Sequence, residues 1–165
     1  MTVMERKDIY ANIGLLATQF AAIEQLVHDI LVKIIVRNAH EISDMFGITI
    51  IENQTLGKRL GLLKKLNRFD NDYTERIGDL VESIEPKISI RNYFIHGVWS
   101  IKENSILIEN KKLKYTKLED GQMWRYGGAK SVQQEELNQL NPDLGVIIEN
   151  AKRILTDIEN YGFEP

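Results

Sequence analysis

The stretch DIYANIGLLATQFAAIEQLVHDILVKI, from Asp8 to Ile34, carries the strongest structural signal in this chain of 165 residues. Its large apolar residues follow one another at alternating steps of four and three, which is the spacing of one face of an α-helix. This apolar seam consists of Ile9, Ile13, Leu16, Phe20, Ile23, Val27, Ile30 and Ile34. It lasts for about seven turns, with Asp8 as the expected N-cap and Asn38 near the far end. A helix of this length needs partners throughout, so it predicts the spine of a bundle or a dimer surface.

The composition favours one ordinary globular domain over residues 1–165. Hydrophobic residues make up 43% and charged residues 27% of the chain, which are typical globular values. The absence of cysteine excludes disulfides, thiolate metal sites and cysteine nucleophiles. The three histidines, His28, His40 and His96, lack the spacing of a zinc protease. We therefore expect no metal and no cofactor.

The charge and hydropathy of the sequence limit the classes of partner and the cellular location that we expect. The first residues lack the long apolar run of a signal peptide, and no stretch reaches the roughly 20 apolar residues of a membrane span. These features predict a soluble cytoplasmic protein with no membrane partner. The net charge of −3 argues against sequence-independent binding to duplex DNA, which needs many Lys and Arg contacts to phosphate. Two basic clusters, at residues 57–65 and 110–117, are expected to be solvated faces.

Two further helical regions follow the long helix. Leucines at positions 56, 60, 63 and 66 predict a second helix with basic residues between them. A third helical region carries Tyr73, Ile77, Leu80, Val81 and Ile84 on its inner face and stops at Gly97. Pro86 lies inside this region, where it either kinks one helix or begins the first turn of another.

The period then changes to that of β-strands. Alternating residues from Val98 onward predict a small antiparallel meander of three or four strands, inserted at about residues 98–128. Helical character returns near Ser131, which would form a capping box with Gln134. Asn141-Pro142-Asp143 is the expected start of the last main helix, whose apolar face runs from Leu144 to Ile158. The sequence therefore predicts a mainly α fold with four main helices and a β insertion between the third and the last.

The stretch SIRNYFIHGVWS, residues 89–100, places a guanidinium, an amide and an imidazole in an otherwise apolar segment. Arg91, Asn92 and His96 are either the polar end of a capped helix or a catalytic centre. Five helical residues turn through about 140°, so Arg91 and His96 do not face one point from a regular helix. A shared site requires either that the helix unwinds near Gly97 or that a second chain supplies its own pair.

RNYFIHG resembles the signature of the HEPN superfamily, in which an Arg, often followed by Asn, precedes a His and a small residue often follows the His. The resemblance implies a helical bundle that dimerises through the motif helix, and here a four-helix HEPN-like bundle. Active members of the superfamily are metal-independent endoribonucleases of toxin–antitoxin, phage-defence and RNA-processing systems. The β-meander departs from the simplest members.

By this resemblance Arg91 and His96 would be the catalytic pair and Asn92 a supporting residue. RNA would be the substrate, the protein would be a homodimer, and an antitoxin protein is a possible partner. Some members bind a nucleotide or a protein without cutting RNA, which gives the first alternative. A purely structural dimeric bundle is the second.

Glu24 is a second supporting candidate, and this expectation comes from its position on the first helix. It lies about 60° from the centre of the apolar seam, where a carboxylate needs a cationic or hydrogen-bonding partner. Arg91 is one option and His28, four residues along the same helix, is the other. The pair with His28 is the simpler expectation.

Overall fold

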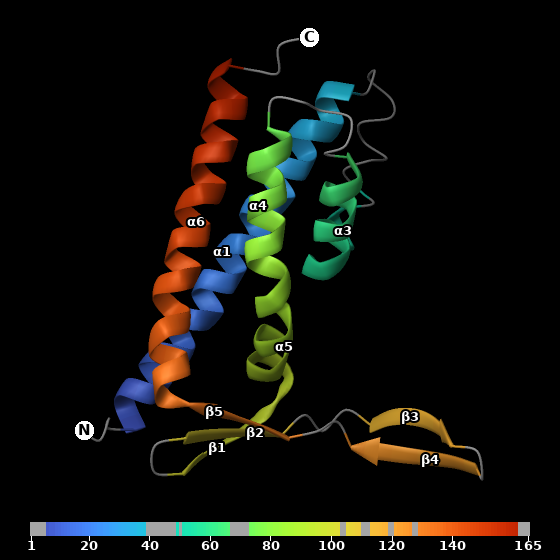
Figure 1. Ribbon diagram of the computed structural model, residues 1–165, viewed down its shortest axis with the longest axis vertical. Helices are drawn as coiled ribbons and strands as arrows, with labels where there is room; N and C mark the ends of the chain where they lie inside the picture. The colour runs from blue at the N-terminus through green and yellow to red at the C-terminus, as the bar shows by residue number, and fades with distance from the viewer. Residues whose placement is uncertain are drawn as a thin grey trace. The chain divides into compact units, whose positions relative to one another are not determined.

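The computed structural model describes residues 6–38, 49, 51–66, 73–102, 105–109, 113–118, 121–126 and 129–161. Backbone contacts divide the chain into two compact units. The sheet unit comprises Met1–Ala17 and Ser89–Pro142, and the helical unit comprises Thr18–Ile88 and Asp143–Pro165. The predicted mainly helical fold, with antiparallel strands between the third and last helical regions, is confirmed (Figure 1). That the whole chain forms one domain stays a prediction.

Helix α1 (Arg6–Asn38) is the long helix that the sequence predicts, although it begins two residues before the expected cap at Asp8. All eight residues of the apolar seam are buried, with exposed fractions of 0–4%. The first three of them lie in the core of the sheet unit and the other five in the core of the helical unit. Because the chain itself covers the seam, the predicted use of the seam as a dimer surface is wrong.

Helix α1 is long and apolar enough over Lys7–Ile35 to cross a membrane, by length and composition alone. This corrects the expectation that no stretch of the chain is apolar enough. The core helix of a soluble protein can have the same length and composition, and the seam of α1 is covered by the chain.

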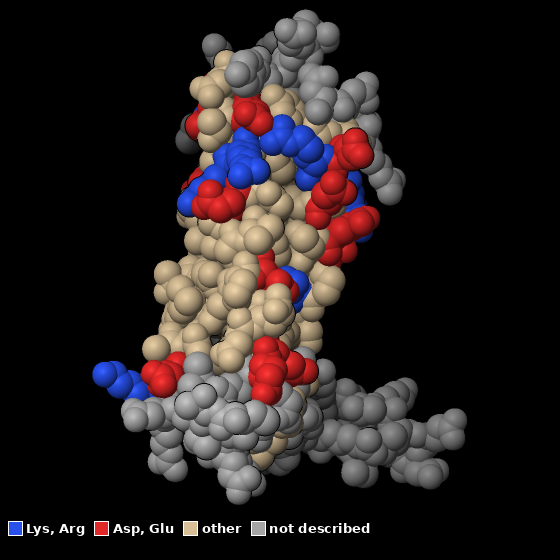
Figure 2. Space-filling view, turned by 60° about the vertical axis from the view of Figure 1, so that its left-hand side comes forward, with Lys and Arg blue, Asp and Glu red and all other residues tan. Residues whose placement is uncertain are grey.

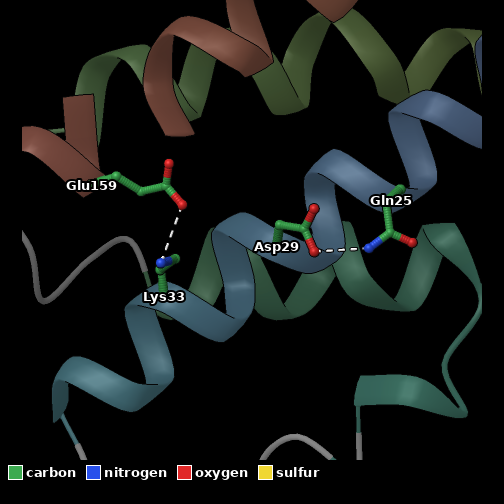
Figure 3. A network of polar contacts seen from close by, with 4 residues as sticks. All are labelled: Gln25, Asp29, Lys33 and Glu159. Atoms are coloured by element: carbon green, nitrogen blue, oxygen red, sulfur yellow. Dashed lines mark hydrogen bonds and ion pairs between the residues drawn. The ribbon is translucent and has the colours of Figure 1, made fainter. Parts of the chain in front are cut away.

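The helical unit packs α1 against α3 (Leu56–Leu66), α4 (Thr74–Ile84) and the second half of α6 (Gln134–Tyr161). The inward residues predicted for the second and third helical regions are buried, except Leu66, which is half-buried. Surface ion pairs connect the helices outside this core. Lys33 of α1 points toward Glu159 of α6 at 3.2 Å (Figure 3), and Arg76 of α4 lies 2.7 Å from Asp157 of α6.

A single guanidinium joins three segments of the helical unit. Arg59 of α3 donates from Nε to the carbonyl oxygen of Ile51 (3.2 Å), from Nη1 to that of Glu24 (3.3 Å) and from Nη2 to that of Glu52 (3.2 Å). Glu24 lies on α1, so this side chain connects α3 to α1. Arg59 belongs to the basic cluster expected to be solvated, and it is half-buried instead. Its neighbour Lys58 is exposed, as expected.

Pro86 lies where the third helical region divides into two helices. It lies in a short 3-10 turn, η2 (Glu85–Lys87), between α4 and α5 (Ile88–His96). The missing N–H of proline is tolerated in a first turn, where helical N–H groups have no partner within the helix. Pro86 therefore separates two helices, and the polar motif lies on the shorter one.

The sheet unit contains five described strands. Strands β1 (Val98–Lys102), β2 (Ser105–Glu109) and β5 (Ala129–Gln133) form an antiparallel sheet in the order β1-β2-β5, with Ile106 opposite Val132. Strands β3 (Leu113–Leu118) and β4 (Gly121–Tyr126) form a separate antiparallel pair. The prediction of one meander ending near residue 128 is therefore wrong, because β5 extends the insertion to Gln133 and returns to β2.

The start of the last helix also differs from the prediction. Ser131 pairs with Leu107 in the sheet instead of forming a capping box, and α6 begins at Gln134. Pro142 lies inside α6. The buried amide of Asn141 donates to the backbone oxygen and to Oδ1 of Asn12 on α1, at 3.4 and 3.3 Å. This residue therefore joins two helices of the sheet unit and does not cap a new one.

Replacing Arg59 by Met should lower the free energy of unfolding by about 2 kcal/mol, because hydrogen bonds from a charged group to three carbonyls are lost. Arg59→Lys should recover only part of this loss, since one ammonium does not reproduce the planar fork of a guanidinium. Urea unfolding followed by circular dichroism measures both effects. Lys58→Met is the matched control and should change stability by less than about 0.5 kcal/mol. Equal stability of the two Met variants would contradict the assigned role of Arg59.

Candidate functional site

The polar motif lies on α5, in the sheet unit. Arg91 and Asn92 are half-buried, and Arg91 Nη1 donates a hydrogen bond to Asn92 Oδ1 at 3.0 Å. Phe94 on the same helix is 2% exposed and anchors α5 in the core of the sheet unit. The helix therefore holds the guanidinium and the amide as a bonded pair.

His96 is the last residue of α5, and it is exposed. The Gly97 amide donates to the carbonyl oxygen of Tyr93 at 2.8 Å, a bond between residues four apart, so the α-helical pattern continues to the end of α5. The last turn is not unwound. Arg91 and His96 consequently leave the helix in directions about 140° apart, and one copy of α5 does not direct both side chains to one point.

These groups have the chemistry to act on a phosphodiester. A guanidinium binds two phosphate oxygens through parallel N–H bonds, and the contact with Asn92 restricts the orientation of Arg91. An imidazole supplies a general acid or base near neutral pH. Arg91 therefore suits phosphate binding and His96 suits proton transfer.

Glu24 lies on α1 in the helical unit, whereas Arg91 belongs to the sheet unit. A contact between these two side chains stays a prediction. The simpler expectation, a pair between Glu24 and His28, is wrong, because the side chain of His28 makes no hydrogen bond or ion pair with a described residue and its Nδ1 is buried without a partner. The carbonyl oxygen of Glu24 accepts a bond from Arg59, so the local environment of Glu24 includes a cation that the sequence did not single out.

The described residues contain no group of three or more His, Cys, Asp or Glu side chains that could hold a metal ion. On the face seen in Figure 2, described Lys and Arg side chains lie among Asp and Glu side chains and do not form a continuous basic stripe. Such a stripe is the usual electrostatic feature of proteins that bind duplex nucleic acid without sequence preference.

Comparisons with protein-family models, curated proteins and solved structures found no match to this chain. The geometry of α5 and the resemblance of its motif are therefore the basis for a functional proposal.

Replacing His96 by Ala should leave the free energy of unfolding within about 0.5 kcal/mol of the wild type, because the side chain is exposed. Phe94→Ala, two residues earlier, should cost about 3–5 kcal/mol because it empties a core position. Thermal and urea unfolding of the two variants test this contrast. A large destabilisation by His96→Ala would assign the imidazole to the fold and would weaken any catalytic role for it.

Proposed function

We propose that this protein is a metal-independent endoribonuclease of HEPN type, acting in the cytoplasm as a toxin or phage-defence component. The observation that carries the proposal is the arrangement on α5, where a guanidinium bonded to Asn92 precedes an exposed imidazole at the helix end. The sequence of these residues resembles the HEPN motif. The mainly helical fold is compatible with a HEPN-like bundle.

The proposed reaction uses the RNA itself as nucleophile. His96 removes the proton of a ribose 2′-hydroxyl, and the 2′-oxygen attacks the adjacent phosphorus. The bond from phosphorus to the 5′-oxygen breaks, the 5′-oxygen takes up a proton from water, and a 2′,3′-cyclic phosphate remains. His96 returns the proton that it removed to water. Arg91 binds the phosphate oxygens and offsets the negative charge that develops on them. This reaction consumes no cofactor and no metal.

The wide angle between Arg91 and His96 is the reason to propose a composite site. In a homodimer whose two-fold axis runs beside α5, Arg91 of one protomer and His96 of its partner would lie in one cleft. The apolar seam of α1 is covered within each chain, so this dimer would use the surface around α5 and not the seam. An antitoxin would then act by blocking the cleft or by separating the protomers.

A catalytically silent module that binds a nucleotide or a protein partner is the second candidate. The hydrogen bond between Arg91 and Asn92 and the partial burial of both residues favour it, since they also suit a guanidinium held for binding or for structure. An assay for RNA cleavage separates the two candidates.

Purified protein should cleave mixed RNA in excess chelator. Arg91→Ala and His96→Ala should each reduce the rate by about 10²–10⁴-fold, the usual effect of losing a positioned acid, base or charge. Lys58→Ala, which removes an exposed cation from α3, serves as the control and should retain full activity. Cleavage that requires added metal, or that survives both α5 substitutions, would refute the proposed mechanism. Folded wild-type protein without activity would favour the silent module.

The composite site has its own test, which is complementation between two inactive variants. Unfolding and refolding a mixture of Arg91→Ala and His96→Ala chains should restore cleavage that neither variant shows alone. In a mixed dimer one cleft keeps both an intact Arg91 and an intact His96. The control is the same mixture without subunit exchange, which should stay inactive. A site built within one chain predicts no recovery, and so does a protein that is monomeric by light scattering.

A further inference from the structure

The helical unit contains a pocket of about 450 Å³ between α4 and α6, built from residues that the α5 motif does not include. Pockets that hold small organic ligands have volumes of roughly 300–1,000 Å³. Leu80 of α4 and Ile154 of α6 form an apolar part of its lining and are 3% and 2% exposed. Arg76, Ser83, Asn150 and Arg153 add polar groups that can donate hydrogen bonds.

Arg153 is an exposed cation of the pocket lining, and its neighbours on α6 leave it without a carboxylate partner among the described residues. The carboxylates one helical turn before and after it on α6 are Glu149 and Asp157, and each has another cation as its partner. Lys152 lies 2.9 Å from Glu149, and Arg76 lies 2.7 Å from Asp157. The hydrogen bond from Lys152, with its charge and a smaller contribution from Arg153, lowers the pKa of Glu149. Arg153 itself makes no hydrogen bond or ion pair with any described residue.

Arg76 and Asn150 supply further donors to the same pocket. Nη1 of Arg76 lies 2.7 Å from the Asp157 carboxylate, and the centre of the Tyr73 ring lies 5.8 Å from the guanidinium carbon. These contacts orient the side chain and leave other N–H groups of the guanidinium available, since arginine carries five. Asn150 is exposed and makes no hydrogen bond with a described residue. Ser83 donates its own hydroxyl to the carbonyl oxygen of Leu80 at 2.7 Å and so is already committed.

The expectation of an anion rests on Arg153, because it is the cation of the lining that has no carboxylate of a described residue at salt-bridge distance, whereas Arg76 is paired with Asp157. Asp79 is the carboxylate that lines the pocket. An organic group could also contact the apolar part of the pocket, which an inorganic anion would not use. We propose that this pocket binds an organic phosphate monoester, with the phosphate between Arg76 and Arg153 and the apolar body against Leu80 and Ile154. Guanidinium groups match the paired oxygens of phosphate, and buried apolar surface adds affinity for the organic part. This site is independent of the proposed ribonuclease centre.

Phenyl phosphate is the first probe, and isothermal titration calorimetry of the full chain without RNA measures its binding. It should bind about tenfold more tightly than inorganic phosphate, because only the ester places a ring on the apolar part of the pocket. It should also bind more tightly than benzoate, which carries a single charge. Equal affinity for phenyl phosphate and benzoate would overturn the assignment of phosphate, and equal affinity for phenyl phosphate and inorganic phosphate would overturn the role of the apolar part.

Two substitutions in the lining, one expected to weaken binding and one expected to strengthen it, test whether the ligand lies in this pocket. Arg153→Met keeps most of the apolar side chain but removes the charge, and it should weaken binding of phenyl phosphate by about tenfold or more. Asp79→Asn should strengthen binding by removing a like charge. Lys58→Met removes an exposed cation of α3 that does not line the pocket, and it is the control. Absence of binding by folded wild-type protein, or the same affinity in Arg153→Met and Lys58→Met, would overturn the proposal.

Discussion

Burial of the apolar seam of α1 is the constraint on which both units depend. Fully burying one large apolar side chain is worth about 1.5–3 kcal/mol, and one helix presents eight of them in a row. The core of the sheet unit buries Ile9, Ile13 and Leu16, and the core of the helical unit buries the residues of the seam from Phe20 onward. The other helices and strands of each unit cover the part of α1 that belongs to that unit. Polar contacts such as those of Arg59 fix which part of α3 lies against α1.

Local patterns predicted the parts of the fold that local physics decides. The seam was found because helical spacing persists over about seven turns, and no competing structure buries the same residues. The start of α6 was misplaced because Ser131-Gln134 and Asn141-Pro142-Asp143 both satisfy the local rules for a helix start. Ser131 does not start a helix because it lies in β5, which pairs with β2. Asn141 does not start one either, because it lies inside α6 and its side chain donates to Asn12 of α1. Both contacts join segments far apart in the sequence, which no local pattern reveals.

The same distinction separates the two candidate sites. Arg91, Asn92 and His96 were recognisable because they occupy one continuous stretch with a recurrent spacing. The pocket between α4 and α6 was not recognised, although residues 76, 79, 80 and 83 share a helix face, because its other wall comes from a segment about seventy residues away. Composition also fails to tell Arg59 from Lys58: the two cations are adjacent, yet one is bonded to three carbonyls and the other is exposed.

Pro142 has a consequence for the backbone hydrogen bonds of α6. Proline has no amide hydrogen, so residue 142 does not donate the usual helical bond to the carbonyl of Asn138. The change from sheet unit to helical unit along α6 falls between Pro142 and Asp143. One hydrogen bond of α6 is therefore missing beside the boundary between the two units, and the rest of the helix continues across it. Amide hydrogen exchange should report two separate protection levels along α6, each following the stability of the unit to which that half belongs.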